Sequence, residues 1–215
     1  MSLLTLITDF LFPKNPKVIS LETLSAGKLL ELLPPPENLK SERTIALFDY
    51  KNKLVKEIVW EVKYNGNRIL ADKLGEILYD TVVAELGERN IFEKTESVLL
   101  IPMPISDRRR FERGWNQAEL LTKALKARDN ASQFKYLPGQ LVKIIHTESQ
   151  TKTQGKKEQL GNLHQSMKVL NPLSVKDRYI VIVDDVTTTG ATFREAERAL
   201  KEAGARKVLC FAIAH

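Results

Sequence analysis

The segment from Val181 to Thr192 constrains the fold of this chain most, because it joins a buried strand to a helix through a polar turn. The run Tyr179–Val183 is apolar and rich in β-branched residues, which is typical of a parallel strand buried on both faces. Residues 189–203 then carry apolar side chains at helical spacing, and Gly204 stands where a helix would stop. Ligands of open α/β sheets bind at the carboxyl ends of the strands, so we expect a binding site at this turn.

The residue types of the turn favour a phosphorylated sugar. Asp184 and Asp185 end the strand, and carboxylates suit sugar hydroxyls, or a cation that bridges to them, better than they suit phosphate, because like charges repel. Backbone amides and the dipole at the start of the following helix favour an anion. A strand followed by a Thr-capped helix explains one acid and one Thr, but not two acids followed by four hydroxyls. The residues expected to bind the ligand are Asp184, Asp185, Val186, Thr187, Thr188, Thr189, Gly190, Ala191 and Thr192.

A basic loop follows a second predicted strand. Ser97–Ile101 is apolar, and the prolines at 102 and 104 stop the strand and direct the chain out of it. Four arginines follow, at positions 108, 109, 110 and 113. A planar guanidinium suits phosphate oxygens, so we predict that Arg109 and Arg113 bind a second phosphate group of the ligand. Taken alone, such a run is more often a solvated basic patch.

The order of the elements predicts an α/β fold. Strand and helix patterns alternate after residue 97, which indicates βαβ units and a mainly parallel core sheet over residues 97–215. We expect one domain over residues 44–215, an N-terminal helical appendage over residues 1–43, and a helical hood formed by residues 1–96. The expected helices are Leu3–Phe12, Leu21–Leu33, Asn52–Tyr64, Arg68–Leu86 and Trp115–Ala127, and the further strands are Thr44–Phe48, Leu141–Ile145, Met167–Leu170 and Lys207–Ala214.

Composition excludes several kinds of site. The 215 residues are 43% hydrophobic and 28% charged, as in ordinary globular domains, and the net charge of +6 fits a phosphorylated small molecule, a nucleic acid or a solvated basic surface. The single Cys210 and three separated histidines argue against a disulfide and against zinc. Ser2–Phe12 is too short for a membrane span and lacks a basic leader, so we expect a cytoplasmic protein.

Two motifs carry a family resemblance. Val181–Thr192 resembles the 5-phosphoribosyl pyrophosphate (PRPP) motif of type I phosphoribosyltransferases, in which apolar residues precede two acids and a Thr/Gly-rich turn. The stretch from Pro102 to Leu120, with Arg109, Arg113 and the run Gly114-Trp115-Asn116-Gln117, resembles a segment of the ComF/GntX family of phosphoribosyltransferase-like proteins. Phe48–Arg68 and Thr147–Leu163 resemble two further segments of that family, in the same order. The likeness implies a type I phosphoribosyltransferase fold, with a twisted, mainly parallel sheet flanked by helices.

The resemblance also implies a reaction. The protein would bind PRPP with Mg²⁺ and transfer its phosphoribosyl group to an unknown acceptor, with release of pyrophosphate. Asp184 and Asp185 would bind the ribose hydroxyls or the Mg²⁺ ion, directly or through water, and Thr187–Thr192 would hold the 5′-phosphate. The catalytic residues would be these two acids with Arg109 and Arg113, which would stabilise the leaving pyrophosphate. Thr147–Leu163 would close over the ligand as a lid.

Two other functions stay open. The ComF/GntX family is associated with competence and DNA uptake, so the alternative is a PRPP- or nucleotide-sensing protein that works with DNA-uptake proteins and catalyses nothing. Direct binding of single-stranded DNA ranks last, because no row of aromatic residues interleaves with the basic ones. A homodimer is compatible with the sequence.

The chain departs from the family pattern in two places. The family commonly begins with a four-cysteine zinc module, and no cysteine stands in that part of this chain. The lid segment carries Lys156 and Lys157 where the family has arginines. The lid thus keeps positive charge but lacks the planar fork of a guanidinium.

Overall fold

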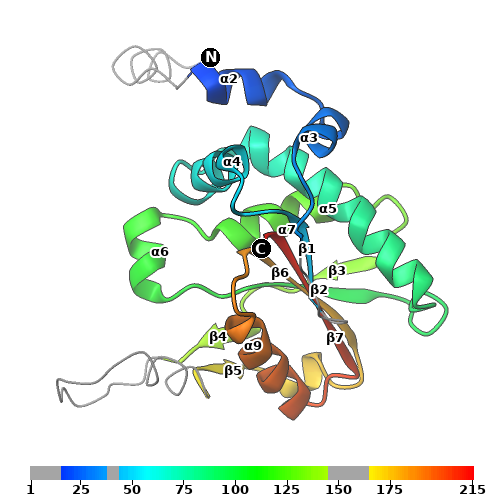
Figure 1. Cartoon of the computed structure of the whole chain (residues 1–215). Coiled ribbons are helices and arrows are strands. Elements are labelled where there is room, and N and C mark those ends of the chain that lie inside the picture. The colour runs from blue at the N-terminus through cyan, green and yellow to red at the C-terminus, as the bar shows by residue number, and fades with distance from the viewer. Residues whose placement is uncertain (1–15, 38–43, 145–164) are drawn as a thin grey trace.

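A five-stranded parallel sheet forms the centre of the molecule. Figure 1 shows the computed structural model, which describes residues 16–37, 44–144 and 165–215. The strands lie in the order β1-β7-β6-β2-β3, and every neighbouring pair is parallel. They are β1 (Thr44–Phe48), β2 (Val98–Pro102), β3 (Phe134–Tyr136), β6 (Tyr179–Val186) and β7 (Lys207–Ala214). The carboxyl end of the central strand β6 therefore meets those of β7 and β2 at one edge of the sheet.

The side chains of β6 alternate between two hydrophobic cores. Val181 and Val183 belong to one core cluster, whereas Ile180 and Ile182 belong to the other, as the two-residue period of a strand requires. All four are buried. The prediction of a parallel strand covered on both faces is confirmed.

Helices cover one face of the sheet, and a helix with a small hairpin covers the other (Figure 1). The first layer contains α2 (Pro16–Thr23), α3 (Ala26–Leu32), α4 (Lys53–Tyr64), α5 (Arg68–Glu88) and α7 (Gln117–Ala127). The second contains α9 (Ala191–Glu202), the antiparallel strands β4 (Leu141–Lys143) and β5 (Met167–Val169), and the short helix η1 (Pro172–Ser174). The helix α6 (Asp107–Arg113) stands apart from both layers, on the connection between β2 and α7.

Asparagine caps start the three helices that reach the functional edge or pack beneath it. The side chains of Asn52, Asn67 and Asn116 accept hydrogen bonds from backbone amides in the first turns of α4, α5 and α7. Between α4 and α5, Gly66 adopts a left-handed φ of 59°. The indole of Trp115 packs so closely on it that an added Cβ would lie 3.0 Å from the ring, and its Nε1 donates to the Val62 carbonyl at 3.2 Å. The start of α7 is thereby fixed against the end of α4.

Several sequence-based boundaries are wrong for identifiable reasons. The helix expected over Leu21–Leu33 is two helices, because Ser25 caps α3 by accepting from the backbone amide of Lys28. The arginine segment is the helix α6 and not an open loop: Ser106 caps its start, and Gly114 ends it with a φ of 80°. The next helix begins at residue 117 because Asn116 is its cap.

Two strands also differ from the prediction. Leu141–Ile145 was expected in the parallel sheet, but β4 pairs antiparallel with β5 in a separate two-stranded sheet. The three-residue strand β3 was not predicted, because it is too short to show a two-residue period. The expected helix Leu3–Phe12 and the lid Thr147–Leu163 lie outside the described residues. The division at residue 43/44 stays a prediction, while β1 shows that the central sheet is not confined to residues 97–215.

Within residues 16–37, 44–144 and 165–215, none of the helices combines the length and the apolar composition that a membrane span needs.

Candidate functional site

The site lies where three neighbouring parallel strands end. Pro102 of β2 pairs with Val183 of β6, and Val186 of β6 pairs with Ala214 of β7. The backbone amide of Met103 also donates to the Val183 carbonyl at 2.8 Å. The connections after β2 and β6, and His215 after β7, therefore share one rim. Both predicted segments, the acidic turn and the arginine segment, lie on it.

Asp185 is buried at the meeting point of α4, α7 and β6. Its side chain is paired with Lys63 of α4, whose Nζ lies 3.2 Å from Oδ2. Gln117, the first residue of α7, donates from Nε2 to Oδ1 at 3.3 Å. Oδ2 makes no hydrogen bond of good geometry with any described residue, although it is fully withdrawn from solvent. The Lys63 ammonium thus compensates the charge of the carboxylate, while Oδ2 can still accept a hydrogen bond.

Arg113 is connected to this carboxylate through Gln117. Its Nη1 donates to Gln117 Oε1 at 3.1 Å, and its guanidinium lies over the ring of Tyr64, 4.9 Å from the centroid. Tyr64 in turn contacts the ring of Trp60, with 5.5 Å between centroids. Trp60 is about half exposed (51%) and is not the core residue that its type suggests. The fold therefore holds one predicted arginine beside the predicted acids and against an aromatic surface.

Asp184 lies at the end of β6, where its surroundings disfavour the ionised form of its carboxyl group. Burial raises the pKa of this carboxyl well above its usual range, and the neighbouring Asp185 carboxylate raises it further. The backbone amide of Asp185, which donates to Asp184 Oδ1 at 2.8 Å, and the ammonium of Lys143 oppose the rise. A cation or hydroxyl donors on a ligand would stabilise the ionised pair of acids.

Lys143 is a site residue that the sequence analysis missed. It ends β4, where burial lowers the pKa of its ammonium, Arg109 lowers it further, and Asp184 opposes the shift. Lys143 and Arg109 are thus two cations close enough to repel each other, facing an acid across the rim. The misassignment of Leu141–Ile145 to the parallel sheet hid this position. The sequence feature that could have identified Lys143 is its position as a lone cation near the end of an apolar run, just before a long polar segment.

A cavity of about 300 Å³ lies between the connection after β2 and the hairpin strand β4. Its lining includes Pro104, Arg110, Asn116, Leu141 and Lys143. The Asn116 side chain both caps α7 and donates to the Met103 carbonyl at 2.9 Å. This wall of the cavity is therefore built by hydrogen bonds before any ligand enters.

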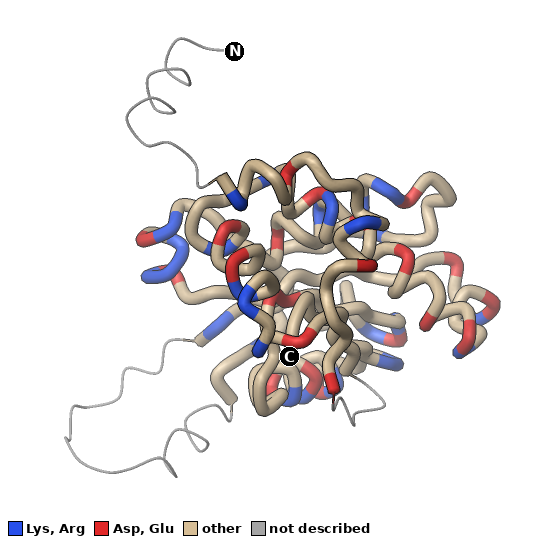
Figure 2. The backbone as a smooth tube through the Cα atoms, turned by 45° about the horizontal axis from the view of Figure 1, so that its top comes forward, with Lys and Arg blue, Asp and Glu red and all other residues tan. Residues whose placement is uncertain are grey.

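The four arginines differ in their partners. Arg108 is paired with Glu112 at 2.7 Å, and Arg110 is paired with Glu119. Among the described residues, Arg109 makes no ion pair, and its exposed side chain is free to turn toward a ligand. Figure 2 shows basic and acidic residues side by side along α6. Ligand binding by Arg109 and Arg113 stays a prediction, but these are the two arginines of the segment that no acid among the described residues neutralises.

The predicted anion turn connects β6 to α9. Thr187 is buried and donates its backbone amide to the Ala214 carbonyl at 2.9 Å, whereas Thr188 and Thr189 are exposed. Gly190 stands at the N-cap of α9 with a left-handed φ of 70° and provides no side-chain cap. Ala191 and Thr192, which begin the helix, are half-buried. Thr189 Oγ1 accepts from the Ala191 backbone amide at 3.3 Å. The turn therefore presents hydroxyls and the amino end of α9 to the rim, which suits an anion.

The two acids fit a hydrated magnesium ion better than a closed metal cage. In the described part of the chain, no three His, Cys, Asp or Glu side chains come together as a metal site. Asp184 and Asp185 would be the protein ligands of the ion, and Mg²⁺ characteristically takes its other ligands from water and substrate phosphates. The Asp185 Oδ2 atom, which has the Lys63 ammonium at 3.2 Å but no hydrogen bond from a described residue, and the raised pKa of Asp184 are the two features that a nearby cation would relieve.

The chain is similar to several known proteins. The family described as "Phosphoribosyl transferase domain" matches residues 125–215. The "DNA utilization protein YhgH" of Shigella flexneri is 27% identical over 188 residues, which cover 86% of this chain and 75% of that protein. The "Competence protein ComFC" of Bacillus subtilis is 27% identical over 166 residues, or 77% of this chain and 60% of ComFC. The expected family resemblance is confirmed.

Two solved structures illustrate the more distant matches. The allosteric regulatory enzyme of purine biosynthesis is 17% identical, with a TM-score of 0.41, over 82% of this chain and 32% of that one. The hypoxanthine phosphoribosyl transferase of Trypanosoma cruzi is 13% identical, with a TM-score of 0.38, over 74% of this chain and 64% of that one.

Proposed function

Because the chain belongs to the ComF family of phosphoribosyltransferase-like proteins and has the type I phosphoribosyltransferase fold, we propose that it binds PRPP with Mg²⁺. We further propose that it transfers the phosphoribosyl group to an acceptor and releases pyrophosphate. One observation carries the proposal: Lys143, at the end of β4, lies close enough to interact with Asp184 of the acidic turn and with Arg109 of the arginine segment. A ligand with a sugar phosphate at one end and a pyrophosphate at the other matches that division of charge.

The turn would bind the ribose 5-phosphate half of the ligand. Thr187–Thr192 would hold the 5′-phosphate through hydroxyls and the amino end of α9. Asp184 and Asp185 would accept hydrogen bonds from the ribose hydroxyls, directly or through the waters of Mg²⁺. When bound there, the ion would neutralise part of the charge of the pyrophosphate. Lys63 and Gln117 keep Asp185 aimed at the rim.

The cationic side would stabilise the leaving group. As the bond from ribose C1 to the pyrophosphate breaks, negative charge grows on the departing oxygen. Cations at that point lower the barrier because they neutralise the growing charge. Arg109 and Lys143 would supply this charge, and Arg113 is held by Tyr64 and Gln117 at the other margin. The lid role of residues 147–163 is part of the same proposal.

A second candidate is a PRPP or nucleotide sensor that acts without turnover in DNA uptake. The names of the relatives, which refer to competence and DNA utilization, favour it. Partners among DNA-uptake proteins and a cytoplasmic location belong to this candidate as well. The two candidates share the ligand and differ in whether pyrophosphate is released.

Titration calorimetry with PRPP and MgCl₂ tests the shared claim. We expect binding at submillimolar PRPP, and loss of binding in the double variant Asp184→Asn/Asp185→Asn without loss of the folded state. Asp80→Asn, a change of an exposed acid on α5, is the matched control and should bind as wild type does. Absence of binding in the wild-type protein would sink the proposal. Pyrophosphate release above the blank then favours the transferase, and binding without release favours the sensor.

A further inference from the structure

Lys63 of α4 supplies a cation to the acidic pair from within the protein. Its Nζ lies 3.2 Å from Oδ2 of Asp185, and the two side chains are 24% and 7% exposed. The Oδ2 atom itself is withdrawn from solvent. A hydrated ion can contact this oxygen only if it sheds water, which Mg²⁺ does reluctantly. The ammonium therefore contacts an oxygen that a hydrated Mg²⁺ ion does not reach while Lys63 is in place.

The fold holds Lys63 in this position. Lys63 lies in the last turn of α4, where the negative end of the helix dipole favours a cation. The end of α4 is fixed by Trp115, which donates from Nε1 to the Val62 carbonyl and packs on Gly66. The ring of the neighbouring Tyr64 has its centroid 6.0 Å from the Lys63 ammonium. The contact with the acidic pair is thus built into the junction of α4 and α7.

Two other carboxylate oxygens of the pair also face protein donors. Gln117 Nε2 donates to Asp185 Oδ1 at 3.3 Å, and Arg113 orients this amide by donating to Gln117 Oε1. The Asp185 backbone amide donates to Asp184 Oδ1 at 2.8 Å. Three of the four carboxylate oxygens thus face a donor or a cation that the chain supplies. Of these three contacts, the one with Lys63 alone brings a full positive charge to the pair.

We propose that Lys63 is a resident cation that prevents divalent ions from binding to the acidic pair in the ligand-free protein. An ammonium and a divalent ion repel each other, and both are attracted to the same carboxylate. The pair therefore binds a divalent ion tightly only when the Lys63 ammonium is removed or displaced, and its acids stay available to ribose hydroxyls. The inference rests on the proposed function for the role of Asp184 and Asp185, and it adds a control of metal binding by Lys63.

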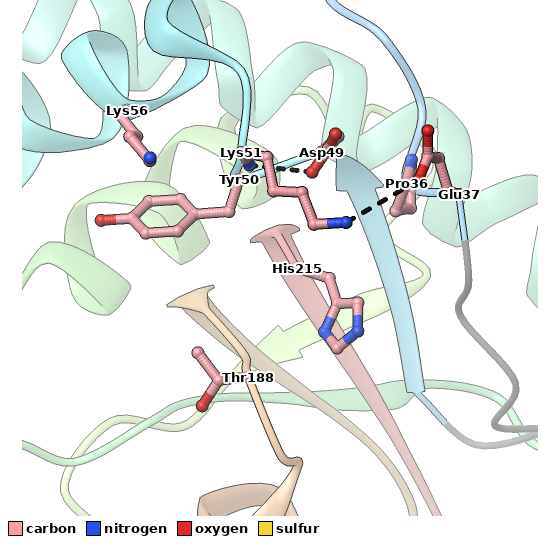
Figure 3. Close-up of a pocket in the computed structure, with 8 residues that line it drawn as sticks. All are labelled: Pro36, Glu37, Asp49, Tyr50, Lys51, Lys56, Thr188 and His215. Carbon is pink, nitrogen blue, oxygen red and sulfur yellow. Dashed lines mark hydrogen bonds and ion pairs between the residues drawn. The ribbon is translucent and has the colours of Figure 1, made fainter.

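A second lysine of the same helix provides the comparison. Lys56 is exposed and lines a separate cavity of about 390 Å³ between the loop after β1 and the ends of β6 and β7 (Figure 3). Tyr50, Thr188 and His215 also line this cavity. The Lys56 ammonium lies 5.9 Å from the centroid of the Tyr50 ring and makes no ion pair with a described residue. Removing Lys56 therefore changes the charge of α4 as much as removing Lys63 does, but leaves the contacts of the acidic pair intact.

Manganese binding in the absence of PRPP tests the role of Lys63. MnCl₂ is titrated into wild type and variants, and electron paramagnetic resonance measures the free ion. Lys63→Ala should bind Mn²⁺ at least about tenfold more tightly than wild type, because a buried carboxylate has lost its cation. Lys63→Arg and Lys56→Ala should bind as weakly as wild type, and the gain should disappear in the double variant Lys63→Ala/Asp185→Asn. An unchanged affinity in Lys63→Ala, a gain shared by either control, or a gain that survives in the double variant overturns the inference.

Thermal unfolding provides a second measurement, because removing Lys63 leaves a buried charge unpaired and weakens the fold. In Lys63→Gln the amide can still donate to Oδ2 but carries no charge, so this variant replaces Lys63→Ala in the manganese titration if the latter does not fold. MgCl₂ should raise the unfolding midpoint of Lys63→Gln and leave that of wild type unchanged. Equal responses of the two proteins would contradict the competition. Neither measurement contains PRPP, so failure of wild type to bind PRPP overturns the proposed function, whereas failure of the metal response overturns the role of Lys63.

Discussion

Replacing Gly75 by alanine should destabilise the protein, because no space for a side chain exists where α5 crosses α7. A Cβ at this position would overlap with the Cβ of Ala124. It would also lie 2.8 Å from the carbonyl carbon of Ala124 and 2.9 Å from the backbone nitrogen of Leu125. Two of these three atoms are backbone, so a change of rotamer cannot relieve the contact. The two helices must separate.

The magnitude follows from two opposing terms. Inserting a methyl group into a packed core costs about 1–3 kcal/mol, and a contact with backbone places Gly75→Ala toward the upper value. The higher helix propensity of alanine returns about 1 kcal/mol. We therefore expect a net loss of roughly 2 kcal/mol in the free energy of unfolding. Because Gln117 at the start of α7 contacts Asp185, PRPP binding should weaken as well.

Urea unfolding followed by circular dichroism measures this loss, and the same helix provides the control. An added Cβ at the exposed Gly87 would meet nothing within 4 Å, so Gly87→Ala should be neutral or stabilise by up to about 1 kcal/mol. Equal stability of Gly75→Ala and wild type would refute the close approach of α5 and α7. Equal destabilisation by both changes would show that crowding is not the cause.

Three further perturbations test separate parts of the structure. Burial raises the pKa of Asp129, but hydrogen bonds from Lys126 and from two backbone amides lower it by more, so the ionised carboxylate stabilises the fold at pH values above its unfolded-state pKa. Asp129→Asn should therefore lower the free energy of unfolding by roughly 1–3 kcal/mol at neutral pH. In urea unfolding, the difference between wild type and variant should shrink as the pH falls through the native-state pKa of Asp129. Glu195 accepts a hydrogen bond from the Met167 backbone amide at 3.1 Å, so Glu195→Gln should loosen the β4–β5 hairpin and speed hydrogen exchange of the Met167 amide more than that of amides in β6. An unchanged exchange rate at Met167 in the variant would contradict the anchoring role of Glu195. Arg113→Lys keeps the charge but loses the planar contact with Tyr64, and calorimetry should show PRPP affinity falling about tenfold, whereas an unchanged affinity would remove Arg113 from the site.

The sequence was sufficient for the central strand and its turn, because local physics determines both. An uninterrupted apolar run identifies a strand buried on two faces, and two acids before a hydroxyl-rich turn identify a polar edge. The expected strand Tyr179–Val183 and the helix after Gly190 are present, and Asp184 and Asp185 lie at the carboxyl end of the sheet. Nothing beyond short-range pattern was needed for these assignments.

Residues brought in by tertiary packing were not predictable in the same way. Lys63 and Gln117 flank Asp185 only because α4 and α7 end at the same rim, and neither position has a sequence signature of its own. The role of Lys143 was not predicted because the strand that contains it was expected in the parallel sheet, and a short apolar run does not reveal which strand it pairs with. His215 forms a wall of a cavity because of a hydrogen bond to Thr187, and a single histidine in a sequence does not indicate such a contact.

The central claim is that one ligand spans the acidic turn after β6 and the cations on the connection after β2 and on β4. Calorimetric titration of wild type and Lys143→Met with PRPP and with ribose 5-phosphate, each with MgCl₂, tests it directly. Wild type should bind PRPP at least about tenfold more tightly than ribose 5-phosphate, because only PRPP has a pyrophosphate to bond with these cations, and a charge-assisted hydrogen bond is worth roughly 1.5–3 kcal/mol. Lys143→Met should narrow this difference and leave ribose 5-phosphate affinity unchanged. Equal affinities of wild type for the two ligands, or an equal loss of both in the variant, would contradict the account.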